Sequence, residues 1–363
     1  MDNENGRQGV TKAQVIAMAM VILFQISIVP TPSMLDGPSD RMESSVSNQL
    51  ETYSLYLTTG NNLSTVLPSE GGQLEASALD TSLEFTTNVL MQSLQVVGDK
   101  RQTGGGSQYY IPLNIFLKAE GPQNSIVTWT FSLQAGGSTV ATGELENEAC
   151  SGFGGCDFEH EAIDVDLTGS GGSSSFTVSE SDELVLVIRA EMTGCGDGGF
   201  FNDCDARVAF NQISGDSRYS LIDISTNAVS DTVFFVQRPG DEFIDGAVVD
   251  WYPNDVISDR EMQFSFDVKS AFGRKDIESV ELRLRYTETN QVMLEKDLTP
   301  VPQQIEWTTE GLFGRFKWTY QSGLESGDYE AELRVTDVQS NVFTISHETV
   351  SYTHLTLPTR DDV

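Results

Sequence analysis

The chain has 363 residues, with 54 acidic and 21 basic side chains and a formal net charge of −33. So acidic a chain excludes nucleic acid as a partner, because binding there depends on neutralising phosphates with Lys and Arg. The charge favours solubility and a hydrated, cation-rich surface. The length allows two or three domains, each with a hydrophobic core of its own.

The first element of the chain is an apolar run from Val15 to Val29, which Pro30 ends. A permanent membrane span needs about 20 apolar residues, whereas the core of a signal peptide needs roughly 7 to 15. Residues 1–33 are therefore predicted to be a signal peptide or an uncleaved signal anchor that contacts the membrane, and a buried core helix is the alternative. Residues 34–50 are predicted to form a linker or stalk.

Short strand-like runs follow one another between residues 51 and 228. Polar and apolar residues alternate through 126–134, and Leu184–Ile188 is the most apolar run and is predicted to form a central strand. Turn residues separate the runs at intervals of about 8–12 residues, and helical periodicity is almost absent. This pattern predicts a β-sandwich over 51–228, and we expect it to be jelly-roll-like.

Four cysteines lie in two Gly-rich stretches of this region: Cys150, Cys156, Cys195 and Cys204. Their even number predicts disulfides, most simply Cys150–Cys156 and Cys195–Cys204. A cross-pairing of the two stretches and a four-thiolate metal site are the alternatives. The spacings within the stretches are wider than those of zinc knuckles, which favours disulfides.

Strand-like runs resume at Val233 and continue to Ser346. Leu324-Glu-Ser-Gly-Asp-Tyr329 precedes a strand-like run that ends at Asp337, with Asn341 beyond it. These residues resemble immunoglobulin-like domains of the fibronectin and PKD type. A Gly-x-Tyr turn before the penultimate strand is the tyrosine-corner pattern, in which the hydroxyl bonds to upstream backbone. The resemblance implies an Ig-like β-sandwich over 232–349, core roles for Trp251 and Trp318, and a function as a spacer, stalk or adhesion module.

The predicted fold class is therefore all-β, with two β-sandwich domains in tandem, jelly-roll-like and then Ig-like, after an N-terminal hydrophobic helix. The Arg-heavy, acidic composition is similar to that of exported proteins from marine or halophilic archaea. Val350-Ser-Tyr-Thr-His-Leu-Thr-Leu-Pro-Thr359 resembles the translation of a transposon-based sequencing adapter. Residues 350–363 are therefore expected to be an artefact and the natural gene to be truncated here.

Oxygen-bearing side chains cluster around the second cysteine pair: Asp197, Asn202, Asp203 and Asp205. Hard oxygen ligands on a Gly-rich loop suit Ca²⁺, although the spacing is not that of an EF-hand, and a solvated acidic turn is the alternative. His160, just beyond Cys156, is expected to be a solvated loop residue, with a metal or base role as the alternative. Asn62-Leu63-Ser64 is a glycosylation sequon that an exported protein would present.

Two pairs of adjacent aromatic residues are candidates for a sugar-binding platform: Tyr109, Tyr110, Phe200 and Phe201. An adjacent pair on a strand places one ring outward, and core packing is the alternative interpretation. Serine-hydrolase, zinc-protease and phosphate-loop motifs are absent from the sequence. The acidic composition makes any single carboxylate pair uninformative about glycoside hydrolysis.

The sequence therefore predicts a non-catalytic exported protein, cell-surface or secreted, that acts in adhesion, ligand binding or envelope structure. Its expected partners are the membrane, through the N-terminal segment, and a glycan or a surface protein, with no cofactor other than Ca²⁺. The alternative is the carbohydrate-binding portion of a larger secreted enzyme whose catalytic domain lies beyond the truncation. A hydrolase that uses carboxylates of the first sandwich is a third hypothesis.

Overall fold

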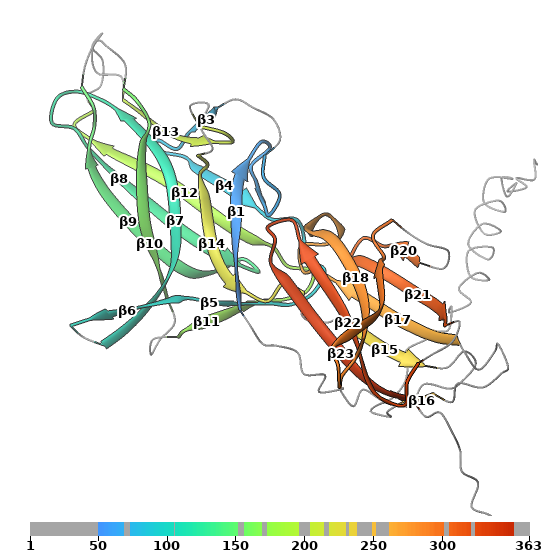
Figure 1. Cartoon of the computed structure of the whole chain (residues 1–363). Coiled ribbons are helices and arrows are strands. Elements are labelled where there is room, and N and C mark those ends of the chain that lie inside the picture. Colours follow the sequence, from blue (N-terminus) through green and yellow to red (C-terminus); the bar gives the residue numbers. More distant parts are fainter. Residues whose placement is uncertain are drawn as a thin grey trace, which may run out of the picture. The chain divides into compact units, whose positions relative to one another are not determined.

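The computed structural model describes residues 50–68, 73–104, 106–151, 156–168, 173–195, 204–213, 218–229, 232–237, 249–251, 261–300, 305–320 and 324–351 (Figure 1). The chain divides into two compact units, Met1–Glu43 and Ser44–Val363, and all the described residues belong to the second. The predicted N-terminal helix and the suspect tail from residue 352 onward lie outside them. Among the described residues, no helix is long and apolar enough to cross a membrane.

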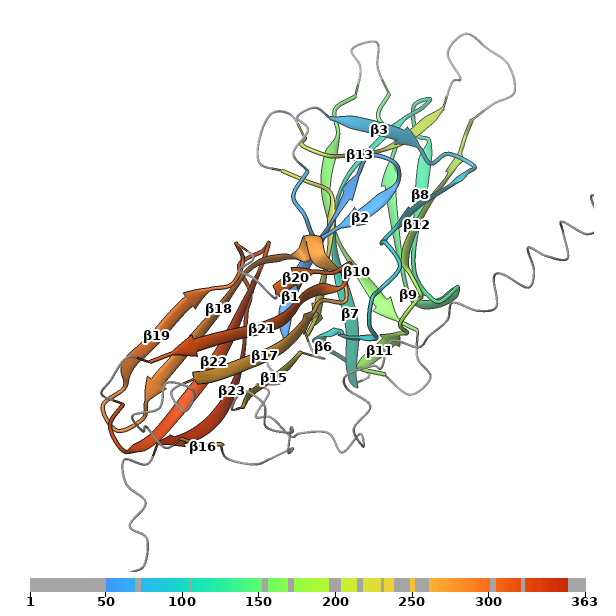
Figure 2. The ribbon, with the colours of Figure 1, turned by 90° about the vertical axis from the view of Figure 1, so that its right-hand side faces the viewer.

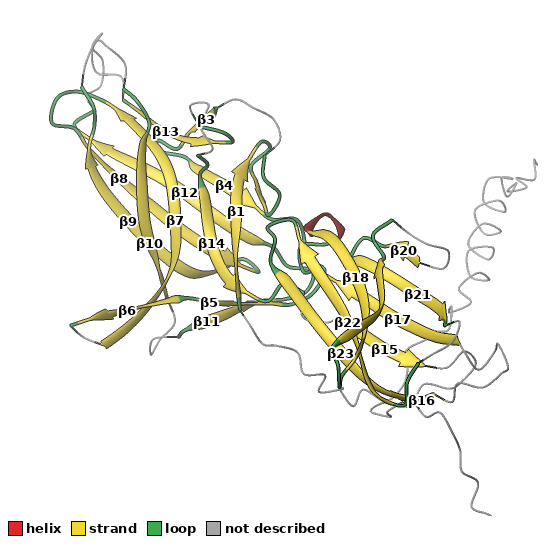
Figure 3. Cartoon of the chain, viewed as in Figure 1, coloured by secondary structure: helices red, strands yellow, loops and turns green. Residues whose placement is uncertain are grey.

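The described part of the chain is built from strands, turns and loops (Figure 3). Its one helical segment is a short 3-10 turn, η2 (Arg274–Asp276). The predicted all-β class is therefore confirmed. This outcome fits the alternating sequence pattern, because alternation places one side of each strand in a core and the other in solvent.

The first part of the unit is one fourteen-stranded sheet. Its strands run in the order β11-β5-β14-β1-β2-β4-β12-β8-β9-β10-β7-β13-β3, with β6 paired to β7. Because β7 also pairs with β14, the path closes on itself. The strands are β1 (Glu51–Thr58), β2 (Asn62–Ser64), β3 (Leu74–Ser77), β4 (Ser82–Thr86), β5 (Leu94–Val97), β6 (Asp99–Thr103), β7 (Gly106–Glu120), β8 (Ile126–Ala135), β9 (Ser138–Glu148), β10 (Glu159–Leu167), β11 (Ser175–Val178), β12 (Leu184–Thr193), β13 (Asp205–Phe210) and β14 (Leu221–Thr226).

The core of this sheet follows from strict alternation. In β8, Val127, Trp129, Phe131 and Leu133 are buried, and the residues between them are more exposed. The apolar run predicted to be central forms β12, which is paired on one side with β4 and on the other with β8. Full burial of each such side chain contributes roughly 1.5–3 kcal/mol, so this alternation is a main source of the fold's stability.

The rest of the unit contains two smaller sheets that share a second core (Figure 2). Phe264 and Leu312 from one sheet and Leu282 and Leu333 from the other belong to the same buried cluster. Two sheets that share one core in this way form a β-sandwich. The first sheet contains β15 (Val233–Gln237), β17 (Glu261–Lys269), β20 (Ile305–Trp307) and β21 (Gly311–Thr319), and the second contains β16 (Val249–Trp251), β18 (Ile277–Tyr286), β19 (Gln291–Asp297), β22 (Gly327–Asp337) and β23 (Val342–Ser351).

The tyrosine-corner hydrogen bond is present in this sandwich. The Tyr329 hydroxyl donates to the carbonyl oxygen of Glu325 at 2.9 Å, and the Tyr329 side chain is almost fully buried. Trp318 is partly buried at the margin of the second core, whereas the side chain of Trp251 lies outside the described residues. The hydrogen bond anchors the start of β22 to the turn before it.

Loops of the second region contact the first region directly. The Gln339 side chain donates to the carbonyl oxygens of Ser54 and Thr65, both at 2.7 Å, and accepts from the Ser54 amide at 2.8 Å. Ala271 and Phe272 pack against the first core. The boundary predicted at residues 228–232 stays a prediction.

A buried carboxyl group lies at this contact. The Asp276 side chain is 1% exposed, and its Oδ2 accepts from the Ser270 hydroxyl at 2.6 Å. Burial is the main cause that raises the pKa of Asp276 from its usual 3.8 to about 6, and the nearby Asp337 carboxylate raises it further. The other carboxylate oxygen, Oδ1, has no hydrogen-bond partner among the described residues.

Candidate functional site: an aromatic groove beside the disulfides

Both predicted disulfides are present. Cys150 bonds to Cys156 and Cys195 bonds to Cys204, which excludes the cross-pairing and the four-thiolate metal site. The two bridges come together at one end of β7, because Glu120 is paired with Cys150 on one side and with Asp205, the neighbour of Cys204, on the other. Disulfides are typical of proteins that fold outside the reducing cytosol.

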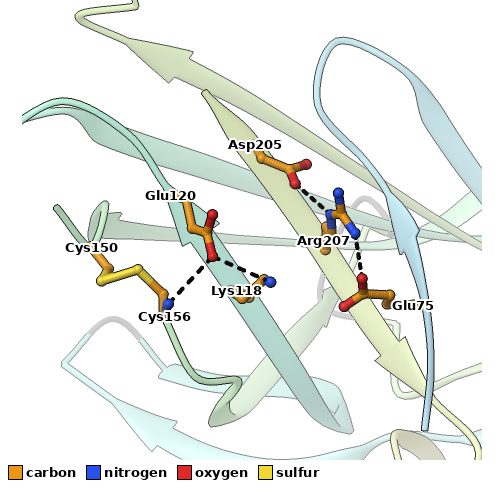
Figure 4. Close-up of polar contacts among 7 residues, drawn as sticks. All are labelled: Glu75, Lys118, Glu120, Cys150, Cys156, Asp205 and Arg207. Atoms are coloured by element: carbon orange, nitrogen blue, oxygen red, sulfur yellow. Dashed lines mark hydrogen bonds and ion pairs between the residues drawn. A yellow bond between two sulfur atoms is a disulfide. The ribbon is translucent and has the colours of Figure 1, made fainter. Parts of the chain in front are cut away.

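A set of charged contacts connects the first disulfide to the outer face of β7 and β13 (Figure 4). Glu120 Oε1 accepts from the backbone amide of Cys156 at 3.3 Å and forms an ion pair with Lys118 at the same distance. On the neighbouring strand, Arg207 forms ion pairs with Asp205 and with Glu75 of β3. These contacts hold the entry to β10 and the edge of the sheet, so the disulfide end has a defined local structure.

The predicted calcium site receives no structural test as a whole. Asp197, Asn202 and Asp203 lie outside the described residues, and the described member, Asp205, forms an ion pair with Arg207. No group of three or more His, Cys, Asp or Glu side chains within the described ranges is arranged to hold a metal ion. The Ca²⁺ site therefore stays a prediction.

An open groove of about 570 Å³ lies nearby on the outer face of the sheet. Its floor crosses four neighbouring strands. Tyr56 of β1 is paired with Leu221 of β14, which is paired in turn with Asn114 of β7. Two residues further along β7, Phe116 is paired with His160 of β10. The described lining residues are Tyr56, Leu67, Asn114, Phe116, His160, Arg218, Tyr219 and Leu221.

Alternation in β7 explains why this face carries apolar side chains. Ile115 and Leu117 point into the main core, whereas Phe116 belongs to a separate buried cluster on the opposite face, with Ala209 and Ile213. Phe116 is 2% exposed, because the segment that contains Ile213 covers it. A small buried cluster, separate from the main core, therefore lies beneath the groove.

Ser220 fixes the segment that carries Arg218 and Tyr219. Its hydroxyl accepts from the backbone amide of Phe116 at 3.1 Å and donates to the carbonyl oxygen of Ala209 at 2.6 Å, and its side chain is fully buried. Its carbonyl oxygen accepts from the Leu57 amide. These bonds connect the groove wall to three strands, so the wall is held rigidly at this point.

Ring contacts bring the functional side chains of the groove together. The Tyr56 and Tyr219 rings meet edge to face, with centroids 5.5 Å apart. The His160 ring lies 5.0 Å from the Phe116 ring, and the Arg218 guanidinium carbon lies 5.5 Å from the centre of the same ring. The groove thus combines apolar ring surface with N–H and O–H donors, the mixture that small-molecule sites generally have.

A second hollow lies further along the same outer face of β10. It is an open cleft of about 790 Å³ between β9 and β10, lined by hydroxyl and carboxylate side chains. Arg101 of β6 pairs with Asp164 at 2.5 Å and with Asp166 at 2.7 Å, and its guanidinium lies 5.4 Å from the centre of the Tyr110 ring. Arg101 therefore pairs with both aspartates, but its single positive charge is outnumbered by the three carboxylates of the lining, Glu144, Asp164 and Asp166.

The described residues predicted to bind a glycan or to carry one, Tyr109, Tyr110 and Asn62, are not among the lining residues of the groove. Tyr109 and Tyr110 are partly buried in β7 at its hairpin with β6, and Phe200 and Phe201 lie outside the described residues. The exposed Asn62 lies in β2, and its side-chain amide donates to the Thr59 carbonyl at 2.8 Å. Neither the aromatic platform nor the glycosylation site is tested by this placement.

One expectation from the sequence is wrong in its local structure. His160 was expected on a loop, but it lies in β10, where it is exposed to solvent on one side and contacts Phe116 on the other. Sequence reasoning also missed Tyr56, Phe116, Arg218 and Tyr219. A signal for Tyr56 existed, since it is an aromatic residue at an outward position of the alternating run Tyr53–Leu57.

Comparisons with known proteins do not define a family. No protein-family model matches the chain, and no curated protein matches it. A search of solved structures finds an α-amino acid ester hydrolase with a TM-score of 0.33 and 8% identity over 48% of this chain. It also finds a β-glucuronidase from Parabacteroides merdae (TM-score 0.23, 10% identity, 73% of this chain) and a GH2 β-galacturonidase from Eisenbergiella tayi (TM-score 0.20, 8% identity, 73% of this chain).

The chain covers 36%, 35% and 43% of the lengths of these three structures, respectively. Similarity of this degree assigns neither a family nor a function to the chain.

Proposed function

We propose that this chain is a non-catalytic, exported binding protein whose first region, residues 51–228, binds carbohydrate in the aromatic groove. The jelly-roll-like sandwich predicted for the first region is instead one closed sheet. In this proposal, the Ig-like region at 232–349 supports that closed sheet at the cell surface or in a secreted protein. The observation that carries the proposal is the groove itself, which is lined by two ring pairs, Tyr56 with Tyr219 and Phe116 with His160, beside polar donors.

The position of the groove favours a carbohydrate over an extended peptide. Peptides often bind by adding a strand to an exposed sheet edge. Here the floor is formed by β1, β14, β7 and β10, and each of these strands is paired on both sides. A ligand must therefore be held by side chains. A sugar ring suits such a surface, because its C–H face can pack on an aromatic ring while its hydroxyl groups meet N–H and O–H groups at the rim.

The groove favours binding over hydrolysis. Glycoside hydrolysis generally needs two carboxyl groups that flank the scissile bond. The described lining residues include no Asp or Glu. The proposal is therefore a binding role, in which a glycan is retained and released without chemical change.

A glycan-binding assay on the full chain tests this function. We expect binding to members of a broad panel of soluble oligosaccharides, and we expect the double variant Tyr56→Ala with Tyr219→Ala to weaken it about tenfold or more, since buried tyrosine contacts often contribute over 1 kcal/mol. Thermal unfolding of the variant would show that it is folded.

Two matched variants separate the groove from the sequence-predicted platforms. Tyr109→Ala with Tyr110→Ala, and Phe200→Ala with Phe201→Ala, should each leave glycan affinity within about twofold of the unmodified chain. Loss of binding in either of these variants but not in the groove variant would transfer the site to that pair. Absence of binding to the whole panel would overturn the proposed function.

A further inference from the structure

We infer that the groove selects acidic carbohydrates, whose carboxylate binds beside Arg218 and His160. This inference rests on the proposed carbohydrate-binding function and specifies its ligand class. The described lining contains two side chains that can carry positive charge, Arg218 and His160, and no acidic one. In a chain with 54 acidic and 21 basic residues, such a composition is unusual for a surface hollow.

The two basic groups contact the same aromatic ring. His160 and Arg218 both lie against the ring of Phe116, at 5.0 Å and 5.5 Å. They come from different parts of the chain, β10 and the segment held by Ser220. Both side chains are exposed, so a ligand carboxylate in the groove could meet either of these basic groups. The guanidinium group has five N–H donors in a planar fork, so it can bind a ligand carboxylate while it keeps contacts within the protein.

The net charge of the chain does not prevent an anion from binding here. At physiological ionic strength the Debye length is about 8 Å, so a ligand in the groove responds mainly to its immediate neighbours. The acidic group that adjoins the groove through Asn114 is Asp223, whose carboxylate accepts from the hydroxyl of Ser54 at 2.6 Å. Burial raises the pKa of Asp223 and the Ser54 hydrogen bond opposes this.

Several other charged groups of the described residues around the groove also have partners within the protein. Lys118 lies over the ring of Phe158, next to Phe116 in the same cluster, and pairs with Glu120. On β10, Glu161 accepts from the Asn147 side chain at 3.0 Å, and Asp164 pairs with Arg101. Glu159 precedes His160 and, by alternation, belongs to the opposite side of the strand. Among the described residues, the basic side chains that contact the Phe116 ring are His160 and Arg218.

The test compares acidic oligosaccharides with neutral forms of identical linkage. The probes are short oligomers of alginate, polygalacturonate and hyaluronan, each beside its carboxyl-reduced counterpart, titrated into the full chain at physiological salt. We expect at least one acidic form to bind about tenfold or more tightly than its reduced form, as for a charge-assisted contact. We expect molar salt to lower this preference, because the Debye length falls to about 3 Å.

Variants assign the preference to the groove. Arg218→Gln and His160→Gln should each reduce the acid-to-neutral affinity ratio by about threefold or more, because each variant loses more affinity for the acidic form than for the reduced form. Thermal unfolding of each variant shows that it is still folded. The matched control is Arg101→Gln, which removes another arginine that lies over an aromatic ring of the same face, and it should leave the ratio unchanged.

The outcomes distinguish the two proposals. Equal affinity for acidic and reduced forms, or a ratio that both groove variants leave unchanged, would overturn the selectivity for acids and leave carbohydrate binding intact. Failure of every probe, acidic and reduced, together with failure of the broad neutral panel, would overturn the carbohydrate-binding function itself. Preferential binding of an acid that depends on Arg218 would support both.

Discussion

The groove and the cleft occupy the same outer face of β10, yet they use charge in opposite ways. In the cleft, Arg101 is paired with Asp164 and Asp166, and Glu144 adds a third carboxylate, so the described lining is net acidic. In the groove, His160 and Arg218 lie against the ring of Phe116 beside two tyrosines. The comparison favours the groove over the cleft for the proposed acidic ligand, because the described lining of the groove contains aromatic and basic side chains and no carboxylate, whereas that of the cleft contains three. Volume alone does not distinguish them, since the cleft is the larger of the two.

The largest expected effect concerns a carboxyl group that has no basic partner. Asp276 forms no ion pair with any described residue, and burial raises its pKa from 3.8 to about 6. Between these two values the folded protein binds the proton more tightly than the unfolded chain does. Raising the pH through this window therefore removes stability, by about 3 kcal/mol at roughly 1.4 kcal/mol per pKa unit.

Urea unfolding of the unmodified chain and of Asp276→Asn, from pH 4 to pH 8, measures this effect. Relative to the unmodified chain, the variant should gain about 2.4 kcal/mol of stability between pH 4 and pH 7, which is most of the full effect. Asp164→Asn, whose carboxylate is paired with Arg101, is the matched control and should show no such gain. A stability difference between Asp276→Asn and the unmodified chain that does not change with pH would contradict the prediction.

The next prediction concerns the wall of the groove that Ser220 holds in place. Ser220→Ala removes the hydroxyl that accepts a hydrogen bond from the Phe116 amide and donates one to the Ala209 carbonyl. Both buried backbone groups then lose this partner. We expect a loss of about 2 kcal/mol in the free energy of unfolding and weaker glycan binding. Urea unfolding and the glycan titration measure the two effects.

Ser132→Ala in the cleft wall is the control for this change. Its hydroxyl is partly exposed and lies 3.5 Å from that of Thr139, so its loss should cost less than about 0.5 kcal/mol and leave glycan binding unchanged. An equal loss in the free energy of unfolding in Ser220→Ala and Ser132→Ala would show that the Ser220 hydrogen bonds do not hold the groove wall.

The smallest effect is expected in the cleft itself. Arg101→Ala leaves Asp164 and Asp166 without their partner, but all three side chains are about one third or more exposed. Exposed ion pairs contribute roughly 0–1 kcal/mol, so the free energy of unfolding should change by less than about 1 kcal/mol. The affinity of the groove for glycan should not change. Urea unfolding and the glycan titration check both statements, and reduced glycan affinity in Arg101→Ala would give the cleft a part in binding.

The sequence predicted strands well where alternation was strong and failed where burial was slight. The run at 126–134 became β8, and the apolar run at 184–188 became part of β12. By contrast, β6 was missed, because its sequence Asp99-Lys-Arg-Gln-Thr103 is mostly exposed and shows no hydrophobic pattern. The short strands β3 and β11 were missed as well. An exposed strand is defined by pairing with a partner, and single-sequence alternation does not report pairing.

The disulfides and the tyrosine-corner hydrogen bond were predictable because each depends on a short local pattern. The groove was not. Its members come from four strands and one loop, and His160 meets Phe116 only through the register of β10 with β7. Residues 44 positions apart, as these two are, show no local sign of contact. Register depends on the whole sheet, and a single sequence does not define it.

The contact made by Gln339 has a practical consequence for dissecting the chain. Its side chain satisfies three backbone groups of Ser54 and Thr65, while Ala271 and Phe272 complete the first core from beyond residue 228. A recombinant fragment that ends at residue 228 would lose these partners and expose apolar surface of the first core. Such a fragment should be prone to misfolding or aggregation, so crystallisation, labelling and display are better attempted with both regions in one polypeptide.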